Sequence, residues 1–312
     1  MQRSKLRIIS RESPLAMWQA EYVRDKLKQQ YSSLVIEIIG IRTEADKFLN
    51  LSLDKMGGKG AFVKELEQAL LNDAADIAVH SMKDVTIELP EQLALPVIMK
   101  REDVRDVMIS NTRTGLEQMP AGSRIGTSSL RRRCQLKALR PDLEILDIRG
   151  NVGTRLKKLD DGKYDALILA AAGVKRLGMQ DRITEFLEVD VLLPAIGQGA
   201  LGVETRANNE DVFELISCLN DDTTHACVTA ERALNRKLSG GCHAPVAAYA
   251  ELLDENLNLR AMVGRLDGSE LLRASVTGQV ELAAVLGESL GQELLDRGAG
   301  DILRESDHEG VN

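Results

Sequence analysis

The sequence is poor in aromatic residues and in cysteine, and each shortage excludes a class of protein. Phe, Trp and Tyr together make up 3% of the 312 residues, which leaves few rings to stack on nucleic-acid bases. The four cysteines, Cys134, Cys218, Cys227 and Cys242, are irregularly spaced and form no Cys-x-x-Cys pair. Because of this spacing we expect neither a disulfide framework nor a zinc site, and no bound metal.

Long apolar runs are missing as well. No stretch approaches the roughly 20 apolar residues that are needed to span a bilayer. Residues 1–8 contain no apolar segment followed by a small-residue cleavage site, as a secretory signal would. We therefore expect a cytoplasmic protein with no membrane partner.

Positive charge is concentrated in one part of an acidic chain. The net charge is −8, yet residues 100–176 contain 17 Lys and Arg against 10 Asp and Glu, a local balance of +7 that leaves −15 for the rest. Nucleic-acid binding needs a wide basic face, so we expect no nucleic-acid partner. A confined site for a small polyanion fits this distribution better.

Alternating strand-like and helix-like segments predict an α/β fold over the first two-thirds of the chain. Ser13 is a typical N-cap and Pro14 a typical first helical residue, so a helix is expected from there to about Gln30. The other expected elements are strands at 6–10, 34–41, 75–80, 124–127, 143–148 and 165–171. Helices are expected after the loop 56–60, with Phe62 on the apolar face, and after Ser129 and Asn151.

Beyond about Asn220 the pattern changes to three strands, at 246–253, 257–265 and 271–278, followed by a helix at about 280–297. Turn residues such as Asp267-Gly268 separate the strands. This pattern predicts a smaller α+β domain with an antiparallel sheet and helices on one face. Residues 194–200 look like a segment that crosses between domains.

Three polar clusters each stand between an expected strand and an expected helix. They are Arg11-Glu12-Ser13, the segment 127–132 and Arg149-Gly150-Asn151. Ligands of open parallel sheets bind beyond the carboxyl ends of the strands. Helix N-termini there offer free N–H groups to anions, and arginine offers a forked donor to carboxylates. A single cluster would be a helix cap beside solvated arginines, but three at equivalent places favour a polyanion site.

Three further residues have plain structural interpretations when they are taken alone. Asp84 follows a buried strand and could act as a general acid or as the counter-charge to a cation, but a loop carboxylate is the simpler interpretation. His80 fits a hydrogen-bonded core histidine better than a base. Cys242 follows two glycines and could be nucleophilic beside a cation or a helix N-terminus, although an inert buried thiol is the commoner case.

Seven segments, in order and at matching spacing, resemble the porphobilinogen deaminase family over almost the whole chain. They are 11–16 (RESPLA), 57–65 (GGKGAFVKE), 80–84 (HSMKD), 126–132 (GTSSLRR), 149–155 (RGNVGTR), 194–199 (PAIGQG) and 240–242 (GGC). The part beyond Cys242 matches more loosely.

The resemblance implies a transferase of tetrapyrrole (haem) biosynthesis, also called hydroxymethylbilane synthase. Such enzymes condense four porphobilinogen molecules head to tail into linear hydroxymethylbilane and release ammonia at each step. Their dipyrromethane cofactor, one per chain, is joined covalently to a cysteine through a thioether, which maps onto Cys242. Their catalytic carboxylate maps onto Asp84, with the implied tasks of assisting departure of the amino group, stabilising the cationic azafulvene and handling the ring proton.

The resemblance also implies which residues hold cofactor and substrate. Since every pyrrole carries an acetate and a propionate, it accounts for the local charge of +7. The implied binding residues are Arg11, Ser13, Ser81, Lys83, Thr127, Ser128, Ser129, Arg131, Arg132, Arg149, Gly150, Arg155, Arg176 and Gln198. A mobile loop that covers the site is implied for Lys55, Gly57, Gly58, Lys59, Gly60 and Phe62.

The implied fold has two domains like type II periplasmic binding proteins, with mixed, largely parallel sheets, and a smaller α+β C-terminal domain that bears the cysteine. We expect domain 1 at 1–100 with about 197–218, domain 2 at 101–196 and the third domain at 219–312, in a monomeric protein. Two departures from the family pattern are mild. Thr86 stands where Pro is frequent, and Ala45 stands where Gly is frequent before Asp46.

Two rival interpretations remain. A non-catalytic binding protein could use the same two-domain architecture, since a fold does not fix a function; such proteins are usually exported, and the expected lack of a signal peptide disfavours this. A nucleic-acid binder that uses Arg131-Arg132-Arg133 is disfavoured by the net charge and the scarce aromatic residues.

Overall fold

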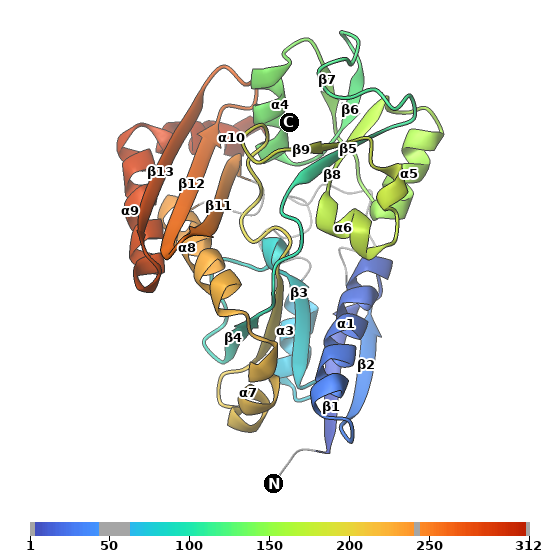
Figure 1. Ribbon diagram of the computed structural model, residues 1–312, viewed down its shortest axis with the longest axis vertical. Helices are drawn as coiled ribbons and strands as arrows, with labels where there is room; N and C mark the ends of the chain where they lie inside the picture. Colours follow the sequence, from blue (N-terminus) through green and yellow to red (C-terminus); the bar gives the residue numbers. More distant parts are fainter. Residues whose placement is uncertain (1–3, 44–62, 240–243, 310–312) are drawn as a thin grey trace. The chain divides into compact units, whose positions relative to one another are not determined.

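The computed structural model describes residues 4–43, 63–239 and 244–309 (Figure 1). Two compact units are present, and each combines segments that are distant in the sequence. Met1–Glu102 and Ala200–His225 form the first unit, and Asp103–Gly199 and Ala226–Asn312 form the second. Helix α8 (Asp222–Leu238) contains the last of the boundaries between them.

A five-stranded mixed sheet organises the first unit. Its order is β2-β1-β3-β10-β4; β1 pairs in parallel with β2 and β3, whereas β10 is antiparallel to β3 and β4. The elements of this unit are β1 (Lys5–Arg11), α1 (Pro14–Gln30), β2 (Val35–Ile41), α3 (Lys64–Leu71), β3 (Ile77–Ser81), β4 (Leu93–Ile98), β10 (Leu201–Arg206) and α7 (Glu210–Ile216).

Helix α1 begins where the sequence predicts it. Ser13 is the N-cap, Pro14 is the first helical residue, and the Ser13 hydroxyl accepts a hydrogen bond from the N–H of Ala16. The apolar face of α1 is buried in one core with residues of β1 and β3. This packing holds the start of the helix beside the carboxyl ends of those strands.

The first sheet of the second unit repeats this arrangement, with order β7-β6-β8-β5-β9. Strand β6 is parallel to β7 and β8, and β5 is antiparallel to β8 and β9. Its elements are β5 (Asp106–Ser110), β6 (Arg124–Gly126), α4 (Leu130–Leu139), β7 (Glu144–Leu146), α5 (Val152–Asp160), β8 (Ala166–Ala170), α6 (Ala171–Arg176) and β9 (Glu185–Leu187).

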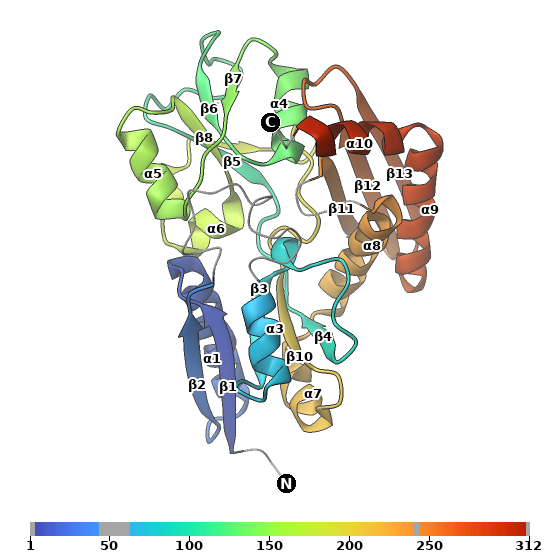
Figure 2. The ribbon, with the colours of Figure 1, turned by 180° about the vertical axis from the view of Figure 1, so that it is seen from behind.

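An antiparallel sheet of three strands, β11-β12-β13, forms the C-terminal part of the second unit. Its helices lie on one face, as the view from behind shows (Figure 2), and share a core with the strands. The other face contacts α4 through Cys134, Ala247 and Met262. The elements are β11 (Val246–Leu253), β12 (Asn256–Gly264), β13 (Leu271–Gln279), α9 (Ala283–Asp296) and α10 (Ala299–Glu309).

The predicted α/β class, with mixed sheets and a small antiparallel C-terminal sheet, is confirmed. Strand β11 matches its expected range residue for residue, and β7 is shorter than expected because the chain turns away after Leu146. Helices α6, α7, α8 and α10 and the strands β4, β5, β9 and β10 were not anticipated from the sequence. Within the described ranges, none of the helices is both long and apolar enough to cross a membrane.

Candidate functional site

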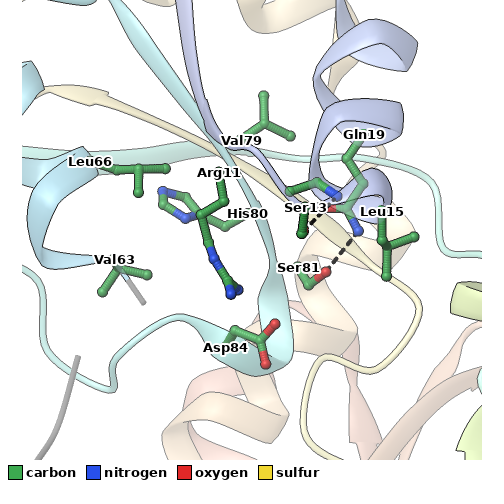
Figure 3. Close-up of a pocket in the computed structure, with 11 residues that line it drawn as sticks. Arg11, Ser13, Leu15, Gln19, Val63, Leu66, Val79, His80, Ser81 and Asp84 are labelled. Atoms are coloured by element: carbon green, nitrogen blue, oxygen red, sulfur yellow. Dashed lines mark hydrogen bonds between the residues drawn. The ribbon is translucent and has the colours of Figure 1, made fainter. Parts of the chain in front are cut away.

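In the first unit, the carboxyl ends of β1 and β3 and the start of α1 form a pocket (Figure 3). Strand β1 ends at Arg11 and β3 ends at Ser81, so the parallel pairing of these strands places both residues at one edge of the sheet. The lining residues are Arg11, Ser13, Leu15, Ala16, Gln19, Val63, Leu66, Val79, His80, Ser81 and Asp84. Four of the residues that the resemblance implies, including the catalytic candidate, therefore line this pocket.

The polar wall of this pocket is built by hydrogen bonds between α1 and β3. Gln19 is 3% exposed, and its side-chain amide donates to the Ser81 hydroxyl over 2.8 Å. The α1 N-terminus, capped by Ser13, opens into the same pocket, where its dipole favours a negative ligand group.

Asp84 ends a single 3₁₀ turn, Met82–Asp84, that follows β3 directly. The turn is anchored by its neighbours: Met82 is buried, and its N–H donates to the carbonyl of Ala200 over 3.0 Å. Val85 on the other side is buried too, while Asp84 and Lys83 are exposed. The Arg11 guanidinium and the Asp84 carboxylate point into the same part of the pocket (Figure 3). The pocket thus presents a carboxylate on a fixed backbone, beside a cation.

His80 has the core role that its sequence position indicated. The ring is 5% exposed, and Nε2 lies 2.8 Å from the Oε2 of Glu204, which is 1% exposed. Burial raises the pKa of the nearby Glu67, and the negative charge of Glu204 raises it further. The partner Glu204 lies on β10, a strand that the sequence did not reveal, so this buried pair was missed.

In the second unit, the loops after β6 and β7 are joined through hydroxyl groups. Thr127 is 2% exposed; its N–H donates to the Leu146 carbonyl over 2.9 Å, and its hydroxyl accepts from the N–H of Ser129 over 3.3 Å. The Ser128 hydroxyl donates to the Ile148 carbonyl over 2.6 Å and accepts from the Ile148 N–H over 3.0 Å. The Thr127 N–H and the Ser128 hydroxyl therefore hold the two loops together at one edge of the sheet, while the Thr127 hydroxyl shapes its own turn.

Two helices begin at this edge. Ser129 caps α4 by accepting from the N–H of Arg132 over 3.4 Å, and Asn151 caps α5 by accepting from the N–H of Thr154 over 2.9 Å. Gly150 has φ +112°, in the left-handed region, and a Cβ there would lie 2.7 Å from Thr154 Cγ2, so only glycine fits without strain. The tight turn therefore leads directly into the α5 N-terminus.

The arginines at this edge differ in what they bind. Nε of Arg155 donates to the Gly150 carbonyl over 2.7 Å, and Nη2 of Arg176 donates to the Gly199 carbonyl over 2.7 Å. Arg149 is half-buried, and its guanidinium has no hydrogen-bond or ion-pair partner among the residues that the structure describes. Arg149 is therefore the arginine of this group with the most open donors.

Arg131 and Arg132 are buried, 3% and 6% exposed, and both bind Asp106 at the start of β5. Arg131 Nη1 lies 2.7 Å from Asp106 Oδ2 and Arg132 Nη2 lies 2.6 Å from Oδ1. The Gln198 side-chain amide donates to Asp106 Oδ1 over 3.0 Å. Burial acts to raise the pKa of Asp106, but the two guanidiniums outweigh it and hold that pKa well below its usual range.

Asp106 was missed from the sequence. Its one signal is a carboxylate that begins a fully apolar strand, Val107-Met108-Ile109, which requires a buried cation elsewhere in the chain. The implied attachment residue Cys242, and the departure at Ala45, lie outside the described residues. So does the implied covering loop, Lys55, Gly57, Gly58, Lys59, Gly60 and Phe62.

Solved structures that resemble the chain include periplasmic binding proteins, at low sequence identity. The periplasmic aliphatic sulphonate binding protein of Escherichia coli has 14% identity and a TM-score of 0.41, with 76% of this chain and 71% of that chain covered. An arginine-specific periplasmic binding protein of Salmonella typhimurium has 12% identity and a TM-score of 0.42, with 71% and 93% covered.

Two family models match almost the whole chain. The model described as porphobilinogen deaminase, dipyromethane cofactor binding domain, matches residues 6–214. The model described as porphobilinogen deaminase, C-terminal domain, matches residues 225–296. The chain therefore belongs to the porphobilinogen deaminase family, the transferases of tetrapyrrole synthesis that bind a dipyrromethane cofactor.

Proposed function

We propose that this enzyme joins four porphobilinogen molecules into hydroxymethylbilane on a dipyrromethane that is thioether-linked to Cys242, with Asp84 as the catalytic group. The observation that carries the proposal is the Asp84 carboxylate in a pocket with Arg11, at the carboxyl ends of parallel strands, where open sheets commonly bind ligands. Family membership supplies the reaction, and the pocket supplies the candidate for its acid–base step.

The described residues fit a group that carries several carboxylates. The Nε–H groups of Arg131 and Arg132 are buried and lack a hydrogen-bond partner among the described residues, which is costly unless a ligand supplies an acceptor. Capped helix N-termini and Arg149 lie at the same sheet edge. When bound, the dipyrromethane supplies the pyrrole to which the first substrate is joined.

The proposed carboxylate-binding residues fall into two groups, one in each unit. In the first unit they are Arg11, Ser13, Ser81 and Lys83. In the second unit they are Thr127, Ser128, Ser129, Arg131, Arg132, Arg149, Gly150, Arg155, Arg176 and Gln198. Ser128 would act chiefly by joining the two loops and Thr127 by shaping its own turn, because their hydroxyls already bind backbone groups.

Asp84 has the chemistry that the amino group of the substrate requires. The aminomethyl group of porphobilinogen is a cation at neutral pH, and a carboxylate pairs with it directly. As ammonia leaves, positive charge develops on the pyrrole, and the same carboxylate stabilises it. It can then accept the ring proton that is lost after coupling. Arg11 would hold a substrate carboxylate beside it.

We further propose that the protein is a cytoplasmic monomer that uses neither nucleic acid nor membrane, and that residues 55–62 cover the site during turnover. The domains proposed are 1–100 with about 197–218, 101–196 and 219–312. Separate hydrophobic cores for the β5–β9 sheet and the antiparallel sheet support division of the second unit.

Intact-mass measurement of the purified protein tests this proposal. We expect an added mass equal to two linked pyrrole units, retained on denaturation because the bond is covalent, and absent in Cys242→Ser. Cys218→Ser, which removes an exposed thiol, is the matched control and should keep the mass. A soluble wild-type protein without added mass would instead support the non-catalytic binding protein.

A further inference from the structure

Three of the proposed binding residues converge on one side chain that has no assigned role. Asp106 is 0% exposed, and it accepts from Arg131 over 2.7 Å, from Arg132 over 2.6 Å and from Gln198 over 3.0 Å. Gln198 also donates to the Val104 carbonyl over 2.7 Å. Gln198 therefore holds both the Asp106 side chain and the backbone that leads into strand β5.

The second contact of each arginine fixes the plane of its guanidinium. Arg131 Nη1 also donates to the Leu193 carbonyl over 2.7 Å, and Arg132 Nη1 donates to the Ile168 carbonyl over 2.8 Å. A guanidinium held at two points cannot rotate about its terminal bonds, so its remaining N–H groups have set directions. Asp106 is the contact that the two arginines share.

Charge at this cluster is unbalanced. One carboxylate faces two guanidiniums, so the buried cluster retains a net positive charge, and both Nε–H groups lack a partner among the described residues. The Arg7–Asp76 pair of the first unit is different, because there Arg7 pairs with two carboxylates, the buried Asp76 over 2.9 Å and the exposed Asp73 over 3.0 Å. Of these two described clusters, the one around Asp106 has the excess positive charge and the open N–H donors that an anion requires.

A purely structural role would not require two buried arginines around one buried carboxylate. A buried ion pair adds little stability beyond what apolar residues of similar volume would add, and a second buried arginine makes the charge balance worse. An arrangement that is poor for stability but leaves directed donors suits binding of one ligand carboxylate.

We propose that Asp106 is a positioning residue, which orients Arg131 and Arg132 so that their free donors meet one carboxylate of a pyrrole. The pyrrole belongs either to the cofactor or to the incoming substrate. This inference rests on the proposed function, because it takes the pyrrole carboxylate as the ligand.

Asp106→Asn, which keeps the shape and removes the charge, tests the proposal. Its matched control is Asp76→Asn, which removes an equally buried, arginine-paired carboxylate from the first unit. Both variants should lower the thermal midpoint. Only Asp106→Asn should show one of two further effects. Either the fraction of protein that carries the cofactor, measured by intact mass, falls to about a tenth, or KM for porphobilinogen on cofactor-bearing protein rises about tenfold while kcat changes less. Both sizes are those expected for a misdirected charge-assisted hydrogen bond.

The two readouts identify the source of the carboxylate: a fall in loading indicates the cofactor, and a rise in KM indicates the substrate. Loading and KM that match those of Asp76→Asn would overturn the proposal.

If Asp106→Asn does not fold, Asp106→Glu decides, since it retains the charge and displaces it by one methylene. We expect an effect of about threefold or more in the same readout, and wild-type values would refute the positioning role. Wild-type protein without the added mass on Cys242 would instead disprove the proposed function.

Discussion

The two strand-end clusters use the same sheet architecture for different purposes. In the first unit, the pocket holds an exposed carboxylate, Asp84, on a three-residue turn. In the second unit, Arg131 and Arg132 are almost fully buried and share the carboxylate of Asp106. One cluster exposes an acid in its pocket, and the other holds two buried cations against an acid.

This difference matches the demands of the two tasks that we propose, proton exchange by Asp84 and carboxylate binding by Arg131 and Arg132. A group that exchanges protons needs contact with a changing ligand, and it benefits from a fixed backbone with an accessible side chain. A group that holds a carboxylate benefits from fixed donors, because their alignment then costs no reorganisation on binding. The comparison predicts that substitution of Asp84 affects chiefly turnover, whereas substitutions in the cluster around Asp106 affect binding and loading.

Asp84→Ala should have the largest effect on turnover. Loss of a positioned acid–base group lowers kcat by about 10²–10⁴-fold. Because Asp84 is exposed and its turn is anchored by buried Met82 and Val85, the variant should fold and retain the two-pyrrole mass. Steady-state kinetics and intact mass measure the two properties on one sample.

Glu91→Gln is the matched control for this change, since it removes another exposed carboxylate of the same unit and should leave kcat unchanged. Near-normal turnover in Asp84→Ala would remove that residue from catalysis. Loss of the added mass in the same variant would show that the contrast between the units is wrong, since Asp84 would then serve loading as well.

Local signals were sufficient for much of the fold. The Ser13-Pro14 pair marks the start of α1, and alternating or apolar runs between turns mark β1, β3, β8 and β11. Strand β10 escaped prediction because it carries buried polar residues, Glu204 and Thr205. These are acceptable in a core only because of distant partners: Glu204 binds His80, and the Thr205 hydroxyl donates to the Asp76 carbonyl. Such pairing cannot be inferred from a short segment.

The candidate site was predictable to a similar extent. Arginine and serine clusters at strand ends predicted a ligand site there, and the structure places Arg11, Ser13, Ser81 and Asp84 around one pocket. What the sequence could not reveal is that Arg131 and Arg132 are buried. A run of three arginines on a helix suggests a solvated face, and only the long-range contact with Asp106, 25 residues before Arg131, reverses that interpretation.

Acid should lower the free energy of unfolding of the second unit by protonating Asp103, another carboxylate that is held by cationic side chains. Burial acts to raise its pKa, but hydrogen bonds from Arg105 and Lys175 outweigh burial and lower the pKa to about 2. Since the folded-state pKa lies below the ordinary 3.8, Asp103 contributes stability above about pH 4 that is lost as the pH falls towards about 2.

Asp103→Asn should therefore reduce the free energy of unfolding at neutral pH, by at most about 2 kcal/mol because solvent screens part of the interaction. The same variant should flatten the dependence of that free energy on pH between about 4 and 2. Denaturant unfolding at a series of pH values measures both effects. An unchanged slope in this range would mean that Asp103 does not differ between the folded and unfolded states.

The smallest effect concerns the helix caps and separates stability from ligand binding. Ser129→Ala removes the α4 cap and should cost about 1 kcal/mol of unfolding free energy, whereas Ser129→Asp retains a good cap and should cost little. The aspartate, however, places a negative charge at the helix N-terminus where we propose that a carboxylate binds, so the loaded fraction should fall below that of the alanine variant.

Ser13→Asp is the matched change at the start of α1. We expect it to lower loading less, because the Arg11 guanidinium in that pocket already lies beside a carboxylate, Asp84. Equal loading of the cofactor in Ser129→Asp and Ser13→Asp, measured by intact mass, would mean that binding of the cofactor carboxylates does not depend more on the second unit than on the first.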